Sequence, residues 1–282
     1  MNFKQGHTLR IAILDLYEGA ENQGMRGLRS IIKEFGEENQ LNILTKEFDI
    51  RLKDEFPGFD FDIYISSGGP GSPIDTEGLP WDTHYMEWID RMEKYNNDPE
   101  NIDKKYVYFI CHSFQLASRF YQIGELARRN STAFGVFPVH LLEDGEAEPV
   151  LAGLEDPFYA VDSRDYQVIQ PNYSRLEDLG AKILCIEKER PHVPYERAIM
   201  GIRFNEYFIG TQFHPEADAM GMTMYLKSEE KKKGVIENYG FEKWQSMIEQ
   251  LEDPDKIRWT YKHIVPNFLK IALKNQKQVT AA

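Results

Sequence analysis

The chain has 282 residues, of which 41% are hydrophobic, so it can bury a substantial core. Its formal net charge of −13 argues against a nucleic-acid-binding surface. No apolar run reaches the length of a membrane span, and the N-terminus lacks the apolar core of a signal peptide. The only cysteines, Cys111 and Cys185, make no disulfide framework. We therefore expect a cytoplasmic protein that binds neither nucleic acid nor a membrane.

The first half of the sequence alternates predicted strands and helices. Apolar runs predict strands at 9–16, 41–50, 61–65 and 106–110. Apolar residues at helical spacing predict one helix at 25–35, which Gly36 ends, and another at 81–95. Such alternation is typical of a parallel sheet with helices on both faces. In these sheets ligands bind beyond the carboxyl ends of the strands, so the segments that follow strands 61–65 and 106–110 are candidate sites.

The second half has a different pattern. Strands are predicted at 133–141, 158–170, 181–186, 198–204 and 207–213, some joined by short turns, which indicates a mixed or antiparallel part. From residue 220 the pattern is helical, with apolar stripes that we interpret as core-facing. We expect residues 1–219 to form one α/β domain and residues 220–282 to form a helical extension packed on it.

Cys111 lies where the predicted strand 106–110 meets a helical pattern. A cysteine at such a corner sits on a sharp turn beside helix N–H groups, which favours the thiolate and suits a nucleophile. Most intracellular cysteines are inert and buried, and Cys185, inside an apolar strand, fits that interpretation. Cys111 is therefore the candidate nucleophile.

His214 and Glu216 follow the last predicted strand, with Pro215 between them. Residues two apart in an extended chain project to the same side, and the proline stiffens this geometry. A carboxylate beside one imidazole nitrogen fixes the tautomer and stabilises the imidazolium that forms when a thiol proton arrives. We therefore predict that His214 acts as a base and that Glu216 orients it.

A glycine-rich loop at 66–72 follows the strand 61–65. Its glycines let the backbone approach a ligand closely and could offer N–H donors to a developing oxyanion. The sequence has no G-x-G-x-x-G fingerprint and no lysine where a phosphate-binding loop requires one. We predict no cofactor and no bound metal.

Together the three motifs resemble those of the class I glutamine amidotransferases. That family has a G-G-P-x-S oxyanion loop, a G-x-C-x-G-x-Q nucleophile elbow and a late H-P-E. The counterparts here are GGPGS at 68–72, FICHSFQ at 109–115 and HPE at 214–216. The resemblance spans roughly residues 9–216 and leaves the helical extension outside.

The resemblance implies a three-layer α/β/α sandwich with a mostly parallel central sheet, flavodoxin-like in organisation, plus the C-terminal helices. It also implies a Cys-His-Glu triad, in which Cys111 is the nucleophile, His214 is the general base and acid, and Glu216 orients His214. By the same resemblance, the N–H groups of Gly69 and His112 are the oxyanion donors, and Gln115 contacts the bound glutamine.

Three positions depart from the family pattern. Phe109 and Ser113 replace the two elbow glycines, and Arg164 stands where family members tend to carry a substrate-lining histidine. Because Phe109 lies two residues before Cys111, we expect it to point to the same side of the strand and narrow the space near the thiol. Ser113 adds bulk and a hydroxyl to the first turn of the helix.

We expect a glutaminase-type enzyme whose small-molecule substrate is glutamine or a γ-glutamyl compound, with ammonia passed to a separate synthetase. One alternative is a γ-glutamyl hydrolase or peptidase, or a homoserine-type acyltransferase, with the same triad. Another is a non-catalytic amidotransferase-like protein in which Phe109 and Ser113 mark a decayed elbow.

Overall fold

The computed structural model describes residues 8–20, 22–191, 196–253 and 256–280. Within them, one continuous sheet contains the strands that both halves of the sequence predict: β1 (Thr8–Asp15), β2 (Asn42–Asp49), β3 (Ile63–Ser66), β4 (Tyr106–Ile110), β5 (Glu125–Leu141), β6 (Phe158–Ile169), β7 (Lys182–Glu187), β8 (Ile199–Arg203) and β9 (Phe208–Thr211). They are hydrogen-bonded in the order β2-β1-β3-β4-β9-β8-β7-β5-β6.

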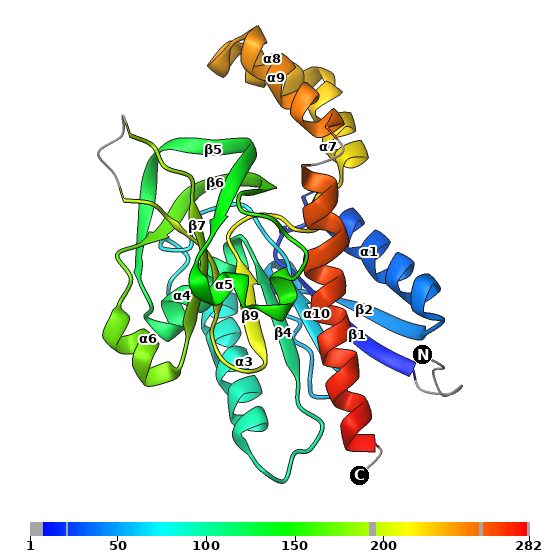
Figure 1. The fold of residues 1–282 in the computed structure, drawn as a ribbon. Coiled ribbons are helices and arrows are strands. Elements are labelled where there is room, and N and C mark those ends of the chain that lie inside the picture. Colours follow the sequence, from blue (N-terminus) through cyan, green and yellow to red (C-terminus); the bar gives the residue numbers. More distant parts are fainter. Residues whose placement is uncertain (1–7, 21, 192–195, 254–255, 281–282) are drawn as a thin grey trace.

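The sheet has a parallel part and an antiparallel part. Neighbours from β2 through β1, β3 and β4 to β9 run parallel. Neighbours from β9 through β8, β7 and β5 to β6 run antiparallel. The predicted α/β sandwich is therefore present, with its parallel strands at the N-terminal side of the sheet (Figure 1). Because β3, β4 and β9 are adjacent and parallel, the residues that follow them meet at one edge.

Helices cover both faces of the sheet. Helices α1 (Gln23–Asn39) and α10 (Ile257–Thr280) pack on one face, and α3 (Pro80–Asn97) and α4 (His112–Tyr121) pack on the other. The shorter elements are α2 (Ile50–Lys53), α5 (Glu143–Glu146), the 3-10 turn η1 (Pro149–Leu151) and α6 (Tyr173–Leu179). None of the helices in the described part of the chain has both the length and the hydrophobicity needed to cross a bilayer.

The prediction that Gly36 ends the first helix is wrong. Helix α1 continues to Asn39, and Gln40 ends it in the left-handed conformation with a φ of 52°. Gly36 is buried, and a Cβ atom at this position would lie 3.2 Å from Cδ1 of Ile43 on β2. The glycine therefore permits close packing of the helix on its neighbour and does not terminate it.

Helices α7 (Ala219–Lys227), α8 (Glu229–Tyr239) and α9 (Phe241–Glu252) form a unit that we call the helical cap. Figure 1 shows the cap above the sheet, with α10 running from it back along the body to the C-terminus. An apolar cluster joins the two parts, in which Leu226, Met247 and Leu251 of the cap accompany Val136 and Val161 of β5 and β6. The division into a domain at 1–219 and an extension at 220–282 stays a prediction.

Candidate active site

Cys111 occupies the corner between β4 and α4 in a strained conformation. Its φ is 50° and its ψ is −100°, a combination of backbone angles that residues other than glycine rarely adopt. The Cys111 N–H donates to the carbonyl oxygen of Thr211 at 2.8 Å, which ties the corner to the end of β9. The residue is 5% exposed and borders a cavity. This is the backbone geometry of a nucleophile elbow.

Ser113 stabilises this corner through its hydroxyl group. The Ile110 N–H donates to Ser113 Oγ at 2.7 Å, and Oγ lies 2.8 Å from the carbonyl oxygen of Ser66, to which it donates. The side chain thus joins the carboxyl ends of β3 and β4. A buried hydroxyl with both its donor and its acceptor engaged is a stabilising group, so serine at this position is compatible with a functional elbow.

His214 and Glu216 form the pair that the sequence predicts. Nδ1 of His214 lies 2.8 Å from Oε1 of Glu216. Burial lowers the pKa of His214, but the negative charges and hydrogen bonds of Glu216 and Cys111 outweigh it and raise that pKa well above 6.5. Because Nδ1 faces Glu216, Nε2 is the nitrogen left for the thiol. At neutral pH the imidazole of His214 therefore carries a proton.

The glycine-rich loop packs directly on these groups. A Cβ atom on Gly68 would lie 2.8 Å from Cε1 of His214 and 3.5 Å from Cβ of Cys111. A Cβ atom on Gly69 would clash with the carbonyl oxygen of Leu16. Only glycine allows the loop to lie this close, so the backbone after β3 borders both Cys111 and the imidazole.

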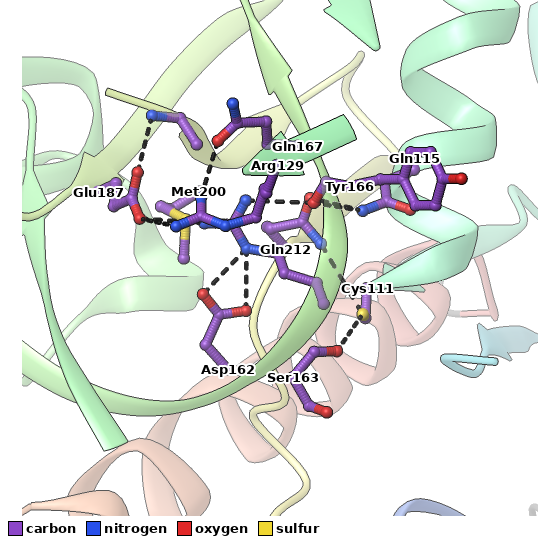
Figure 2. Close-up of polar contacts among 12 residues, drawn as sticks. Cys111, Gln115, Arg129, Asp162, Ser163, Tyr166, Gln167, Glu187, Met200 and Gln212 are labelled. Carbon is purple, nitrogen blue, oxygen red and sulfur yellow. Dashed lines mark hydrogen bonds and ion pairs between the residues drawn. The ribbon is translucent and has the colours of Figure 1, made fainter. Parts of the chain in front are cut away.

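Two further groups contact the sulfur of Cys111, as Figure 2 shows. Nε2 of Gln212 lies 3.8 Å from Sγ, and the thiol lies 3.8 Å from the carbonyl oxygen of Ser163. Gln115 is one residue further away, because its Nε2 donates to Oε1 of Gln212 at 3.0 Å and to the carbonyl oxygen of Tyr166 at 3.2 Å. Gln115 borders the cavity, and its hydrogen bond orients Gln212. The sequence does not indicate the contact between Gln212 and the thiol.

Arg164 stands where the family resemblance leads us to expect a histidine. Its guanidinium belongs to a buried cluster of ion pairs. Its Nε lies 2.9 Å from Oδ2 of Asp162, and its Nη2 lies 3.4 Å from Oε1 of Glu187. Figure 2 shows Glu187 beside Arg129, whose Nη2 is 3.1 Å from the same Glu187 oxygen. Burial raises the pKa of Glu187, but the charges of Arg164, Arg129 and Arg190 dominate and lower it below 4.5. The cluster supports the backbone at Ser163, next to the thiol.

The expectation that Phe109 narrows the space near the thiol is wrong. Phe109 belongs to the apolar cluster on the α3 and α4 face, where its ring centroid lies 5.7 Å from that of Phe204. Cys111 belongs to the cluster on the opposite face. The positive φ of Cys111 breaks the strand alternation on which the expectation depended.

Tyr17 also borders the site, although none of the three sequence motifs includes it. Its hydroxyl would lie 3.2 Å from a Cβ atom on Gly68, and its side chain borders the cavity. Burial and the nearby charges of Glu216 and Cys111 raise the pKa of Tyr17 well above 10, so the phenol keeps its proton. Tyr17 lies two residues after the end of β1, and the rule that ligands bind beyond the carboxyl ends of parallel strands could have indicated it.

One cavity of about 500 Å³ brings the predicted residues together. All six predicted site residues border it: Gly69, Cys111, His112, Gln115, His214 and Glu216. The lining also includes Thr132 of β5 and Asp165 of β6, together with Tyr225 and Lys231 of the helical cap. The cavity is therefore a joint feature of the strand ends and the cap, which the sequence motifs do not indicate.

Comparison with protein families identifies the class to which this fold and cavity belong. Residues 26–229 match the family described as glutamine amidotransferase class I. This match covers most of the sequence, and the chain belongs to that family. A comparison with curated protein sequences returned no match.

Solved structures with the same fold include several amidotransferases. A glutamine amidotransferase from Thermotoga maritima is similar with a TM-score of 0.67 and 15% identity, over 95% of this chain and 100% of that one. A putative GMP synthase subunit from Thermoplasma acidophilum has a TM-score of 0.56 and 17% identity, over 97% and 98% of the two chains. The CTPS glutaminase domain of Trypanosoma brucei, with bound acivicin, has a TM-score of 0.51 and 14% identity, over 74% and 86%. At these identities the likeness concerns the fold.

Proposed function

We propose that this protein hydrolyses the γ-amide of glutamine through an acyl-enzyme on Cys111. One observation carries the proposal: the Cys111 thiol, the imidazole of His214 paired with Glu216 and the glycine loop meet at the wall of one cavity. A nucleophile, a base with an orienting carboxylate and a source of backbone N–H donors are what amide cleavage by a cysteine requires.

In the proposed reaction, Sγ of Cys111 attacks the γ-carbonyl carbon, and the electron pair of the C=O bond moves to oxygen. We assign the stabilisation of this oxyanion to the N–H groups of Gly69 and His112; His112 is the first residue of α4, so its N–H has no partner within the helix. The tetrahedral intermediate collapses with cleavage of the C–N bond, and the proton on His214 leaves with ammonia. Water, deprotonated by His214, then cleaves the thioester and releases glutamate.

The fate of the ammonia forms a second part of the proposal. We infer that a separate synthetase accepts it. The names of two proteins with similar folds, a CTPS glutaminase domain and a putative GMP synthase subunit, support this inference. Co-purification of the chain with an ammonia-using enzyme, together with glutamine-dependent activity of the pair, would test it.

The cavity favours one second candidate, a γ-glutamyl hydrolase or peptidase. At about 500 Å³ the cavity has the size of sites for drug-like ligands, which are roughly 300–1,000 Å³, whereas glutamine is much smaller. Lys231 of the cap adds a cation to the cavity lining, where a carboxylate on the leaving amine could bind. The same triad would serve both reactions, so only the leaving group differs.

Intact mass spectrometry after treatment with 6-diazo-5-oxo-norleucine tests the nucleophile and the substrate class together. We expect one adduct that maps to Cys111 and is absent from Cys111→Ala. Cys185→Ala is the matched control, because Cys185 is fully buried and burial raises the pKa of its thiol. Ammonia release from glutamine, compared with glutamate release from γ-glutamyl peptides, separates the two candidates. No adduct and no hydrolysis would favour a non-catalytic protein and overturn the proposal.

A further inference from the structure

Arg51 lies beside the proposed oxyanion donors, although no sequence motif includes it. It belongs to α2, at the carboxyl end of β2, and its side chain is only 4% exposed. Its Nη1 donates to the carbonyl oxygen of Pro70 at 2.7 Å, and its Nη2 lies 2.7 Å from Nε2 of His112. One guanidinium thus binds both the glycine loop and the first residue after the nucleophile.

These two contacts are adjacent to the two donors assigned above. Pro70 follows Gly69 directly in the chain, and the His112 side chain belongs to the same residue as the second N–H. We infer that Arg51 is a positioning residue that holds the two oxyanion donors, Gly69 and His112, at a fixed separation. This inference concerns the proposed acyl chemistry at Cys111 and deepens it.

The surroundings of Arg51 hold the guanidinium in place and keep it charged. Its carbon atom Cζ lies 4.8 Å from the ring centroid of Trp81, within the range of a cation–π contact. Its Nη1 is 3.6 Å from the half-exposed carboxylate of Glu18. Burial lowers the pKa of Arg51 and the nearby carboxylates raise it, but an arginine stays protonated in either case. A fixed positive charge beside the donors favours the developing oxyanion.

The contact with Arg51 also assigns the tautomer of His112. A guanidinium can only donate, so Nε2 of His112 is the acceptor and its proton resides on Nδ1. Burial, with the charges of Arg51 and Arg119, lowers the pKa of His112 well below 6.5. His112 is therefore a neutral acceptor for Arg51 and is not a second general base beside His214.

The test compares two reactions of the same sulfur. Acylation of Cys111 by p-nitrophenyl acetate releases p-nitrophenolate through a tetrahedral oxyanion, whereas alkylation by iodoacetamide displaces iodide without forming one. In Arg51→Met we expect acylation to slow by about 10- to 100-fold, somewhat less than the loss caused by removal of a direct donor. Alkylation should change by no more than about twofold, because the sulfur, His214 and Glu216 are intact. Arg51→Lys keeps the charge but not the two-pronged geometry and should recover only part of the acylation rate.

Arg119→Met is the matched control. Arg119 is also a largely buried arginine; it binds the carbonyl oxygen of Pro73 in the segment after the glycine loop and pairs with Asp82 at 2.6 Å. Its loss should reduce stability without changing the ratio of acylation to alkylation. Both rates are expressed per mole of folded protein, with thermal unfolding as the check.

The outcomes distinguish a failure of the positioning role of Arg51 from a failure of the proposed function. An unchanged ratio in Arg51→Met, an equal loss in Arg119→Met, or failure of both Arg51 variants to fold would overturn the positioning role. Absence of Cys111-dependent acylation in the wild type would overturn it too. Normal ester acylation with no cleavage of glutamine or γ-glutamyl compounds would instead contradict the proposed function, while the ratio would still test Arg51.

Discussion

The cavity is lined by the ends of the strands, which we call the strand-end wall, and by the helical cap, and these two parts of the molecule differ in how deeply they are buried. Among the residues that support the strand-end wall from behind, the side chains of Ser67, Ser113 and Gln212 are at most 1% exposed and hydrogen-bonded. In the helical cap, by contrast, Met224 is 66% exposed and Phe241 is 53% exposed. A buried polar network whose members are hydrogen-bonded holds reacting groups in place. A lightly buried helical unit can change its conformation at a small cost in free energy. We therefore assign the chemistry to the strand ends and substrate preference to the cap.

The largest effect should come from removal of the sulfur at the strand-end wall. Cys111→Ala should lower kcat for γ-amide cleavage by about 10⁴-fold or more, because no acyl-enzyme can form. The measurement is ammonia release under saturating glutamine, with Cys185→Ala as the control that keeps its activity. Activity retained in Cys111→Ala would break the comparison, since the chemistry would then lie elsewhere.

Glu216→Gln should lower kcat by roughly 10²- to 10⁴-fold, because the amide carries no charge to stabilise the His214 imidazolium and can select the wrong tautomer. The pH dependence of alkylation should shift with it, since Glu216 helps to raise the pKa of His214. Glu148→Gln is the control, because Glu148 is also buried but pairs with Arg203 outside the cavity wall. Equal losses in both variants would indicate a general effect of a buried amide.

Glu187→Gln tests the rigidity of the strand-end wall. The variant leaves Arg129 and Arg164 buried with one carboxylate fewer, and loss of one member of a buried ion cluster costs about 3–5 kcal/mol. Urea denaturation measures this cost as a change in the free energy of unfolding. A cost below about 1 kcal/mol would mean that the cluster is not what holds Ser163 beside the thiol.

At acidic pH the wild type should lose its greater stability relative to Glu187→Gln. The pKa of Glu187 is lowered below 4.5 in the folded protein, so its stabilising contribution is fully present above 4.5 and is lost as the pH falls through the folded pKa. We expect the difference in unfolding free energy to be constant between neutral pH and about pH 5 and to shrink at lower pH. A difference that grows on acidification would contradict the assignment.

The smallest effect is expected at the cap. Lys231→Met should raise KM about two- to fivefold for γ-glutamyl substrates that carry a carboxylate on the amine, because a partly exposed ion pair contributes at most about 1 kcal/mol. The value of kcat should not change. Lys233→Met is the control, since Lys233 is exposed and pairs with Glu237. A large fall in kcat would show that the cap takes part in the chemistry, and the division of roles between the strand ends and the cap would then be wrong.

The motifs that the sequence predicted well are those in which neighbouring residues determine the geometry. The run 106–110 before Cys111 gave the strand and its corner, and the spacing of His214 and Glu216 gave their contact. The prediction for Phe109 failed because strand alternation was extended across a residue with positive φ. The prediction for Gly36 failed because a glycine inside a helix can serve packing as well as termination.

The sequence by itself determined the family, the α/β order and the corner at Cys111, because strand periodicity, glycines and a two-residue spacing act on local backbone geometry. Only the tertiary structure decided which distant side chains meet at that corner. Arg51 contacts His112 across 61 positions, Gln212 contacts Cys111 across 101, and Lys231 reaches the same cavity from the cap. These contacts depend on the order of strands in the sheet and on helix packing, which no local pattern specifies.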